Sequence, residues 1–162
     1  MRPSPKSDPG GFTWITLPAV LASLEPIRRF VVEEAETAAL RGGQMVKLEL
    51  VLEEVVVNVM RHAYPPDAPG AIEVGCRGEQ PGQLCVQVRD AGRAFDPLSR
   101  PEEDLSLGLD ERPAGKMGIF LVKRLTQSVS YERSDGLNIL TFRVGADPDP
   151  SPSPVENERK EA

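Results

Sequence analysis

A stretch without Gly or Pro, residues 44–63, limits what this chain can fold into more than any other feature. Its apolar residues recur every three or four positions, as they do along one side of a helix that packs on a core. They are Met45, Leu48, Leu52, Val55 and Val59. Two prolines after Tyr64 end the pattern, because proline cannot continue a helix. The sequence therefore predicts a long helix whose apolar side needs another layer to cover it.

Two polar residues of this helix, Glu54 and Asn58, are four positions apart and so share one face, a turn from each other. An Asn carboxamide oxygen suits a single protein ligand for Mg²⁺, which takes its other ligands from water and nucleotide phosphates. A carboxylate beside it can accept the proton of an attacking hydroxyl. The alternative is that Glu53, Glu54 and Asn58 only solvate an exposed edge of the helix.

The remaining elements follow from hydrophobic period and turn residues. We expect strands at 12–17, 71–77, 84–90, 128–133 and 138–144, and helices at 24–41 and 118–126 besides the long one. Ser23 is the expected N-cap of the helix at 24–41, and Gly42 and Gly43 end that helix. Helices packed on one face of a mainly antiparallel sheet predict an α+β fold, a two-layer α/β sandwich.

The two ends differ in composition from this central part. Residues 1–11 are rich in Pro, Ser and Gly, and residues 146–162 in Pro and charge, so neither buries enough apolar surface to order itself. We expect a flexible N-terminal segment, one folded domain over residues 12–145 and a disordered tail. Residues 98–114 show no period, and a connection of that length is more often a functional flap than a passive link. We predict a mobile lid there.

The charge balance narrows the partners. A formal net charge of −6 over 162 residues disfavours direct nucleic-acid binding, which needs clustered Lys and Arg. No run approaches the roughly 18 apolar residues of a membrane span, and the N-terminus lacks the apolar core of a signal peptide. We therefore expect a cytoplasmic protein with no membrane association.

The chain has two cysteines and one histidine, too few for a structural zinc site built from Cys and His alone. Pairing the apolar faces of the first predicted hairpin sets Cys76 beside Leu84 and sends Cys85 to the opposite side of the sheet. We expect both thiols to be free.

Asp90 ends an apolar strand, and Gly92 follows two residues later. A carboxylate at the mouth of a pocket can accept a hydrogen bond from an exocyclic amine such as that of adenine. The alternative is an ordinary turn after a strand, which is common.

Two glycines, Gly115 and Gly118, precede an apolar helical run. Backbone N–H groups at a helix start can bind phosphates, and glycine leaves no Cβ in the way. Glycines at helix starts also serve packing alone. A P-loop is excluded, because Met117 stands where that motif requires Ser or Thr.

Three other side chains have structural interpretations. His62 follows Asn58 by four positions and could reach the site, but a histidine near a helix end more often interacts with the terminal carbonyls. We favour that structural role. Trp14 and Tyr131 are expected to pack on strands rather than stack on a ligand.

Taken in order, these motifs resemble the GHKL ATP-binding superfamily and, within it, the RsbW-type anti-sigma factor serine/threonine protein kinases. The segments that carry the resemblance are residues 48–64, 90–97 and 115–122, and residues 135–141 close the pattern. The resemblance covers nearly the whole predicted core, from about residue 12 to residue 144.

The resemblance implies a GHKL-type sandwich that uses ATP and Mg²⁺. In such a protein Glu54 would be the general base, Asn58 would bind Mg²⁺ and Asp90 would read the adenine amine. Gly92, Gly115 and Gly118 would shape the pocket, Lys116 would contact phosphate, and Thr141 would support the adenine end. The nucleotide-binding residues that it implies are Asn58, Asp90, Gly92, Gly115, Lys116, Gly118 and Thr141.

Similar proteins phosphorylate a serine or threonine of a small anti-anti-sigma partner of the STAS type, and alternatively sequester a sigma factor. The resemblance thus implies a kinase in a partner-switching circuit, with a homodimer left open. One alternative is an ATP-binding regulatory module that holds a partner without kinase activity. The catalytic piece of a histidine autokinase is disfavoured. His62, the only histidine, lies in the long helix that carries Glu54 and Asn58, which leaves no separate histidine to accept a phosphate.

Overall fold

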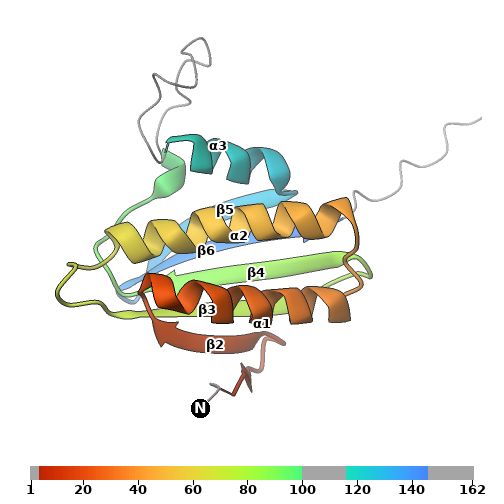
Figure 1. Cartoon of the computed structure of the whole chain (residues 1–162), viewed down its shortest axis with the longest axis horizontal. Coiled ribbons are helices and arrows are strands. Elements are labelled where there is room, and N and C mark those ends of the chain that lie inside the picture. The colour runs from red at the N-terminus through yellow and green to blue at the C-terminus, as the bar shows by residue number, and fades with distance from the viewer. Residues whose placement is uncertain (1–3, 100–115, 146–162) are drawn as a thin grey trace, which may run out of the picture.

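The computed structural model describes residues 4–99 and 116–145, without the side chains of Lys116 and Met117 (Figure 1). The predictions made for Gly115, for the Lys116 side chain, for residues 100–114 of the lid and for the tail 146–162 lie outside the described residues.

Within residues 4–99 and 116–145, one antiparallel sheet forms one layer of the molecule. Its strands are β1 (Lys6–Ser7), β2 (Thr13–Pro18), β3 (Ala71–Gly78), β4 (Gln83–Asp90), β5 (Ser128–Ser134) and β6 (Leu137–Gly145). Their order across the sheet is β1-β2-β3-β4-β6-β5, and every neighbouring pair is antiparallel. The antiparallel register of β4 and β6 places two residues near the ends of these strands, Asp90 and Asn138, directly opposite each other.

In the described part of the chain, three helices form the second layer. They are α1 (Leu24–Thr37), α2 (Gly43–His62) and α3 (Lys116–Leu125), with 3₁₀ turns at Leu21–Ser23 and Pro97–Ser99. Figure 1 shows them on one side of the sheet, with α2 between α1 and α3. The α+β two-layer sandwich predicted from the sequence is confirmed. None of the described helices is long and apolar enough to cross a membrane.

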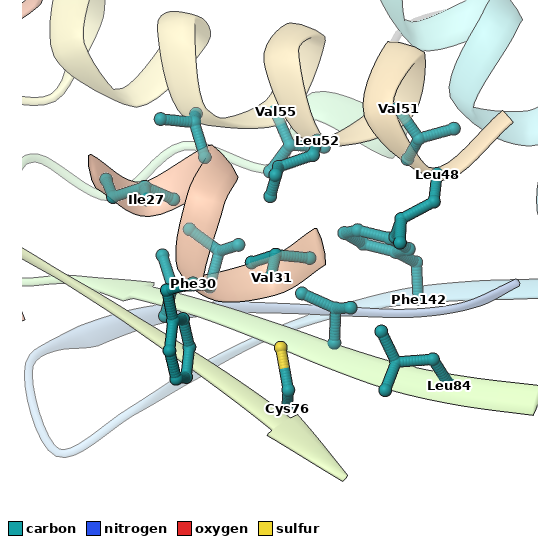
Figure 2. Close-up of a cluster of buried hydrophobic side chains, with 14 of the residues drawn as sticks. Ile27, Phe30, Val31, Leu48, Val51, Leu52, Val55, Cys76, Leu84 and Phe142 are labelled. Atoms are coloured by element: carbon teal, nitrogen blue, oxygen red, sulfur yellow. The ribbon is translucent and has the colours of Figure 1, made fainter. Parts of the chain in front are cut away.

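The core lies between the layers, where the apolar side of α2 meets the inward faces of the strands. Figure 2 shows Leu48 of α2 directed toward Phe142 of β6, with Leu84 of β4 beyond it, and Leu52 directed toward Val31 of α1. All of these side chains are buried. Burial of such a side chain stabilises the fold by about 1.5–3 kcal/mol. This packing holds α2 on the sheet and so fixes the position of the polar residues farther along the same helix.

The ordered part of the chain begins before the predicted boundary at Phe12. Lys6 pairs with Trp14 as part of β1. Asp8 fastens the connection, since its carboxylate accepts hydrogen bonds from Phe12 N at 3.0 Å and from Trp14 Nε1 at 2.8 Å. One acidic side chain thus orders a segment whose composition predicted flexibility.

The first helix also differs from its prediction at both ends. Ser23 precedes α1 but does not cap it with its side chain, because the 3₁₀ turn runs directly into the helix and holds Ser23 in a helical conformation. The helix ends at Thr37 rather than near Gly42, and Ala39 takes a positive φ of 65° just beyond it.

The hairpin of β3 and β4 pairs Cys76 with Val86 and not with Leu84, because its loop begins after Gly78. The shift is two residues and so keeps each side chain on its predicted face. Cys76 and Cys85 are on opposite faces, buried and free, as predicted.

Candidate nucleotide-binding site

A pocket lies between the C-terminal half of α2, the start of α3 and the ends of β4 and β6. Its empty volume is about 520 Å³, part of it open to solvent. Its walls combine apolar side chains of both layers with a few polar groups. The lining residues are Val55, Asn58, Val59, His62, Ala63, Val88, Asp90, Arg93, Phe95, Pro97, Ile119, Tyr131, Asn138 and Leu140. Apolar walls with a few polar groups among them are typical of small-molecule sites.

Asp90 is the buried acid of the pocket, with 6% of its surface exposed. Its Oδ1 accepts hydrogen bonds from Gly92 N at 3.0 Å and from Asn138 Nδ2 at 2.9 Å. Among the described residues no group donates to Oδ2. A carboxylate that is fixed through one oxygen presents the other to a ligand that carries an N–H donor.

Asn138 holds the surroundings of Asp90 together. Besides the bond to Asp90, its Nδ2 donates to Arg93 O at 2.8 Å, and its Oδ1 accepts from Tyr131 Oη at 2.6 Å and Phe95 N at 3.3 Å. The side chain is 7% exposed, and its two Nδ2 hydrogens and its carbonyl oxygen all have partners. A satisfied amide at this depth fixes β4, β5 and the loop after Asp90 in one arrangement.

Gly92 lets that loop lie against the end of α2. A Cβ at this position would overlap the carbonyl oxygen of Ala63 and lie 2.7 Å from its Cβ. The backbone crosses here because Arg93 N donates to Ala63 O at 3.1 Å. Any larger residue would push the loop, and Asp90 with it, away from the helix.

Tyr64 secures the same junction from the other side. Its hydroxyl donates to Ala71 O at 2.7 Å and accepts from Ala91 N at 2.8 Å. The ring lies on Gly70, where a Cβ would overlap it. Burial is the main cause that raises the pKa of the Tyr64 phenol above its usual value. The phenol stays protonated at neutral pH and so keeps its donor role.

Asn58 lines the pocket, whereas Glu54 does not. Glu54 is half-buried one turn earlier on α2 and lies against Gly118 in the first turn of α3. Neither side chain forms a hydrogen bond or ion pair with the part of the chain that the structure describes. Both groups are therefore available to a ligand at the junction of the two helices.

Two residues with expected structural roles line the pocket. His62 is exposed at the last position of α2, and Tyr131 reaches the pocket from β5. The prediction that Tyr131 only packs on its strand is incomplete, because alternation on β5 turns this side chain toward the helices.

Thr141, which we expected to support the adenine end, does not line the pocket. Thr141 lies three residues after Asn138 on β6, so the two side chains are on opposite faces of the sheet. Its Oγ1 accepts from Gln87 Nε2 at 3.0 Å on the face away from the helices. Asn138, which the closing motif contains, is the β6 side chain next to Asp90.

The composition of the pocket fits a purine nucleotide. Apolar side chains such as Val59, Ile119 and Leu140 suit a flat ring, and the open oxygen of Asp90 suits an amine. No group of three or more His, Cys, Asp or Glu residues that could hold a metal is found within the described residues. Mg²⁺ in nucleotide sites usually takes most of its ligands from phosphates and water.

The sequence matches the family described as the histidine kinase-like ATPase domain over residues 17–144. The chain belongs to this family. The matched residues of this ATPase domain run from the end of β2 to the end of β6, and so include every described residue of the pocket.

Among individual proteins, this ATPase domain is similar to the serine/threonine-protein kinase BtrW of Bordetella bronchiseptica. The two are 30% identical over 118 residues, which is 70% of this chain and 82% of BtrW. It is 27% identical to the serine-protein kinase RsbW of Bacillus subtilis over 97 residues, 57% of this chain and 59% of that protein. The RsbW of Oceanobacillus iheyensis is 25% identical over 105 residues, 62% of this chain and 65% of the relative. The chain thus spans less than two thirds of these two RsbW proteins.

A solved structure with the same fold contains the RsbU and RsbW domains of a Mycobacterium tuberculosis protein. The TM-score is 0.59 at 16% sequence identity, with 84% of this chain and 33% of that chain covered. This likeness supports the ATPase-domain fold.

Proposed function

We propose that the protein binds ATP in the pocket between α2 and β4, with its adenine on the apolar wall and its exocyclic amine donating to Asp90. The observation that carries this proposal is the arrangement of Asp90, whose Oδ1 is held by Gly92 N and Asn138 Nδ2. The carboxylate needs no rearrangement before it accepts a ligand, so little binding free energy is lost in ordering it.

Asn58 supplies the protein ligand for Mg²⁺ in this proposal, and the phosphates supply others. When bound, the cation neutralises charge that develops on the transferred phosphoryl group. Asn58 suits this role because its amide lines the pocket and makes no bond to any described residue. Gly118, at the start of α3, shapes the side of the site next to α2.

Glu54 acts as the general base for transfer to a serine or threonine of a partner protein. The hydroxyl oxygen of the partner forms a bond to the γ-phosphorus, the bond from that phosphorus to the β–γ bridging oxygen breaks, and ADP leaves. The hydroxyl proton goes to the Glu54 carboxylate. The position of Glu54 beside the pocket rather than in its lining supports this role, since the base must meet the incoming partner and not the adenine.

The substrate is a small anti-anti-sigma protein of the STAS type, and a sigma factor competes for the same protein in the cytoplasm. The names of the relatives, serine/threonine-protein kinase BtrW and serine-protein kinase RsbW, support the kinase part of this proposal. Phosphorylation adds about −1.5 to −2 charges to the antagonist and so changes which partner is bound.

The experiment incubates the full chain with Mg²⁺ and ATP labelled on the γ-phosphate, together with the proteins that co-purify with it. Label on a serine or threonine of a small co-purifying protein is the expected result. Nucleotide binding without any transfer would favour the regulatory module that holds a partner without kinase activity. No binding of ATP or ADP would reject both.

A further inference from the structure

Gly118 and Glu54 are in contact across the α2–α3 interface. Gly118 is the third residue of α3 and is buried. A Cβ built on it would overlap Oε2 of Glu54, and would lie 3.2 Å from the carboxyl carbon Cδ and 3.7 Å from the Glu54 Cβ. The Glu54 carboxylate therefore occupies the space that any side chain at position 118 would need.

The backbone of α3 does not require a glycine at this position. Gly118 is helical and its φ is not in the left-handed region. Glycine inside a helix is less favourable than alanine, so helix stability alone favours alanine here. The steric relation to Glu54 is what distinguishes this glycine from Gly43 on α2, where an added Cβ would meet nothing within 4 Å.

The overlap concerns the far end of a flexible side chain and not backbone. With an alanine at position 118 the helix can stay in place, and the Glu54 carboxylate must turn away from α3. Glu54 has no hydrogen bond or ion pair with the described residues that would resist this movement. Packing against the bare Cα of Gly118 is therefore the contact that sets where the carboxylate lies.

We propose that Gly118 is a positioning residue that sets the location of the Glu54 carboxylate through direct contact. This inference rests on the proposed function, in which Glu54 takes the proton of the attacking hydroxyl. The role of Gly118 is then independent of any contact with nucleotide. A shift of a reacting group by about 1 Å can lower a rate by on the order of 100-fold, because the reacting atoms are no longer aligned.

The test compares Gly118→Ala with the control Gly43→Ala, which adds the same methyl group to a helix in open space. We expect Gly118→Ala to fold, to bind nucleotide, and to lower kcat about 10- to 100-fold. The control should leave kcat and affinity unchanged. An equal kcat for Gly118→Ala and the wild type would overturn the proposal, as would an equal loss in both variants.

A double-mutant cycle tests the contact itself. Glu54→Asp shortens the side chain by one methylene and moves the carboxylate away from the added methyl group. The loss of kcat caused by Gly118→Ala should therefore be smaller in the Glu54→Asp background than in the wild type. Additive losses in the cycle would contradict the contact.

A spectroscopic readout separates this inference from the proposed function. The carboxyl carbon resonance of Glu54, assigned with Glu54→Gln, should move in Gly118→Ala and stay in place in Gly43→Ala. A moved resonance in a protein without transferase activity would retain the contact and reject the proposed kinase. An unmoved resonance would reject the positioning role, whatever the activity.

Discussion

Asn138 donates a hydrogen bond from Nδ2 to Oδ1 of Asp90 over 2.9 Å, near the ends of the paired strands β6 and β4. The same amide accepts from Tyr131 Oη and Phe95 N, so that three elements meet at one side chain. This relationship explains how a buried carboxylate keeps one orientation before a ligand arrives. Orientation of Asp90 by β6 is the structural basis of the proposed adenine recognition.

Asn138→Ala should lower both stability and nucleotide affinity. The substitution leaves Tyr131 Oη and the carbonyl of Arg93 without their partner, and unpaired buried polar groups cost about 1–3 kcal/mol each. Urea unfolding measures the stability and calorimetry measures the affinity. Thr141→Ala is the matched control on the same strand, since Thr141 faces the other side of the sheet. Equal affinities in the two variants would contradict the role of Asn138.

Glu54→Gln should bind Mg²⁺ and ATP as the wild type does and transfer almost no phosphate. The amide keeps the shape of the side chain against Gly118 but cannot accept the hydroxyl proton. Single-turnover transfer of γ-labelled phosphate measures the loss. Glu53→Gln serves as the control, because Glu53 is the exposed neighbour on the same helix. Transfer by Glu54→Gln at the wild-type rate would show that another group is the base.

Tyr64→Phe should destabilise the fold by about 1–3 kcal/mol, because Ala71 O and Ala91 N both lose their hydrogen-bond partner. The ring that fills the space at Gly70 is retained, so cavity formation does not contribute. Urea unfolding of the variant measures the difference. A weaker nucleotide affinity should accompany it, because Ala91 directly follows Asp90. An unchanged free energy of unfolding would contradict the stabilising role assigned to the two hydrogen bonds of the Tyr64 hydroxyl.

The thiols should react only after unfolding. Burial raises the pKa of Cys76 well above its usual value and also raises that of Cys85, so the folded protein holds both thiols in the unreactive protonated form. Because the pKa of each thiol is raised in the folded protein, burial of the neutral thiols contributes fully to stability below the usual thiol pKa of about 8.5. This contribution to stability is lost as the pH rises above that value. Alkylation by iodoacetamide at pH 8 should be slow in buffer and fast in urea. Rapid labelling of the folded protein would contradict this burial.

Hydrophobic period predicted the layers of this fold because both layers depend on it. The apolar side of α2 and the apolar faces of β3 and β4 are both buried when the helix packs on that face of the sheet. The structure has this arrangement. The helix and strand ends were less accurate. Asp8 orders β1 through two side-chain hydrogen bonds, and the 3₁₀ turn before α1 removes the capping role of Ser23. The amino-acid composition of a segment does not predict such local contacts and turns.

The sequence indicated those residues of the candidate site whose side-chain chemistry alone points to a role. Asp90 and Asn58 line the pocket as expected, whereas Asn138 and Tyr131 belong to it through strand register. Alternation along β6 could have indicated Asn138 in place of Thr141. Because residue 138 pairs with Asp90, residue 141 lies on the other face of the sheet. The contact between Glu54 and Gly118 depends on how α2 and α3 pack, which spacing along the chain does not determine.

The central claim is that Asp90 reads the adenine of ATP, and calorimetric titration with Mg²⁺ and ATP tests it most directly in the wild type, Asp90→Asn and Thr141→Ala. Asparagine keeps the shape of Asp90, but it removes the charge and can place an amide hydrogen where the ligand amine would donate. We predict equal binding by the wild type and Thr141→Ala, and a loss of about 1.5–3 kcal/mol in Asp90→Asn, the scale of a hydrogen bond to a charged group. Absence of binding by the folded wild type, or equal binding by Asp90→Asn, would contradict the account.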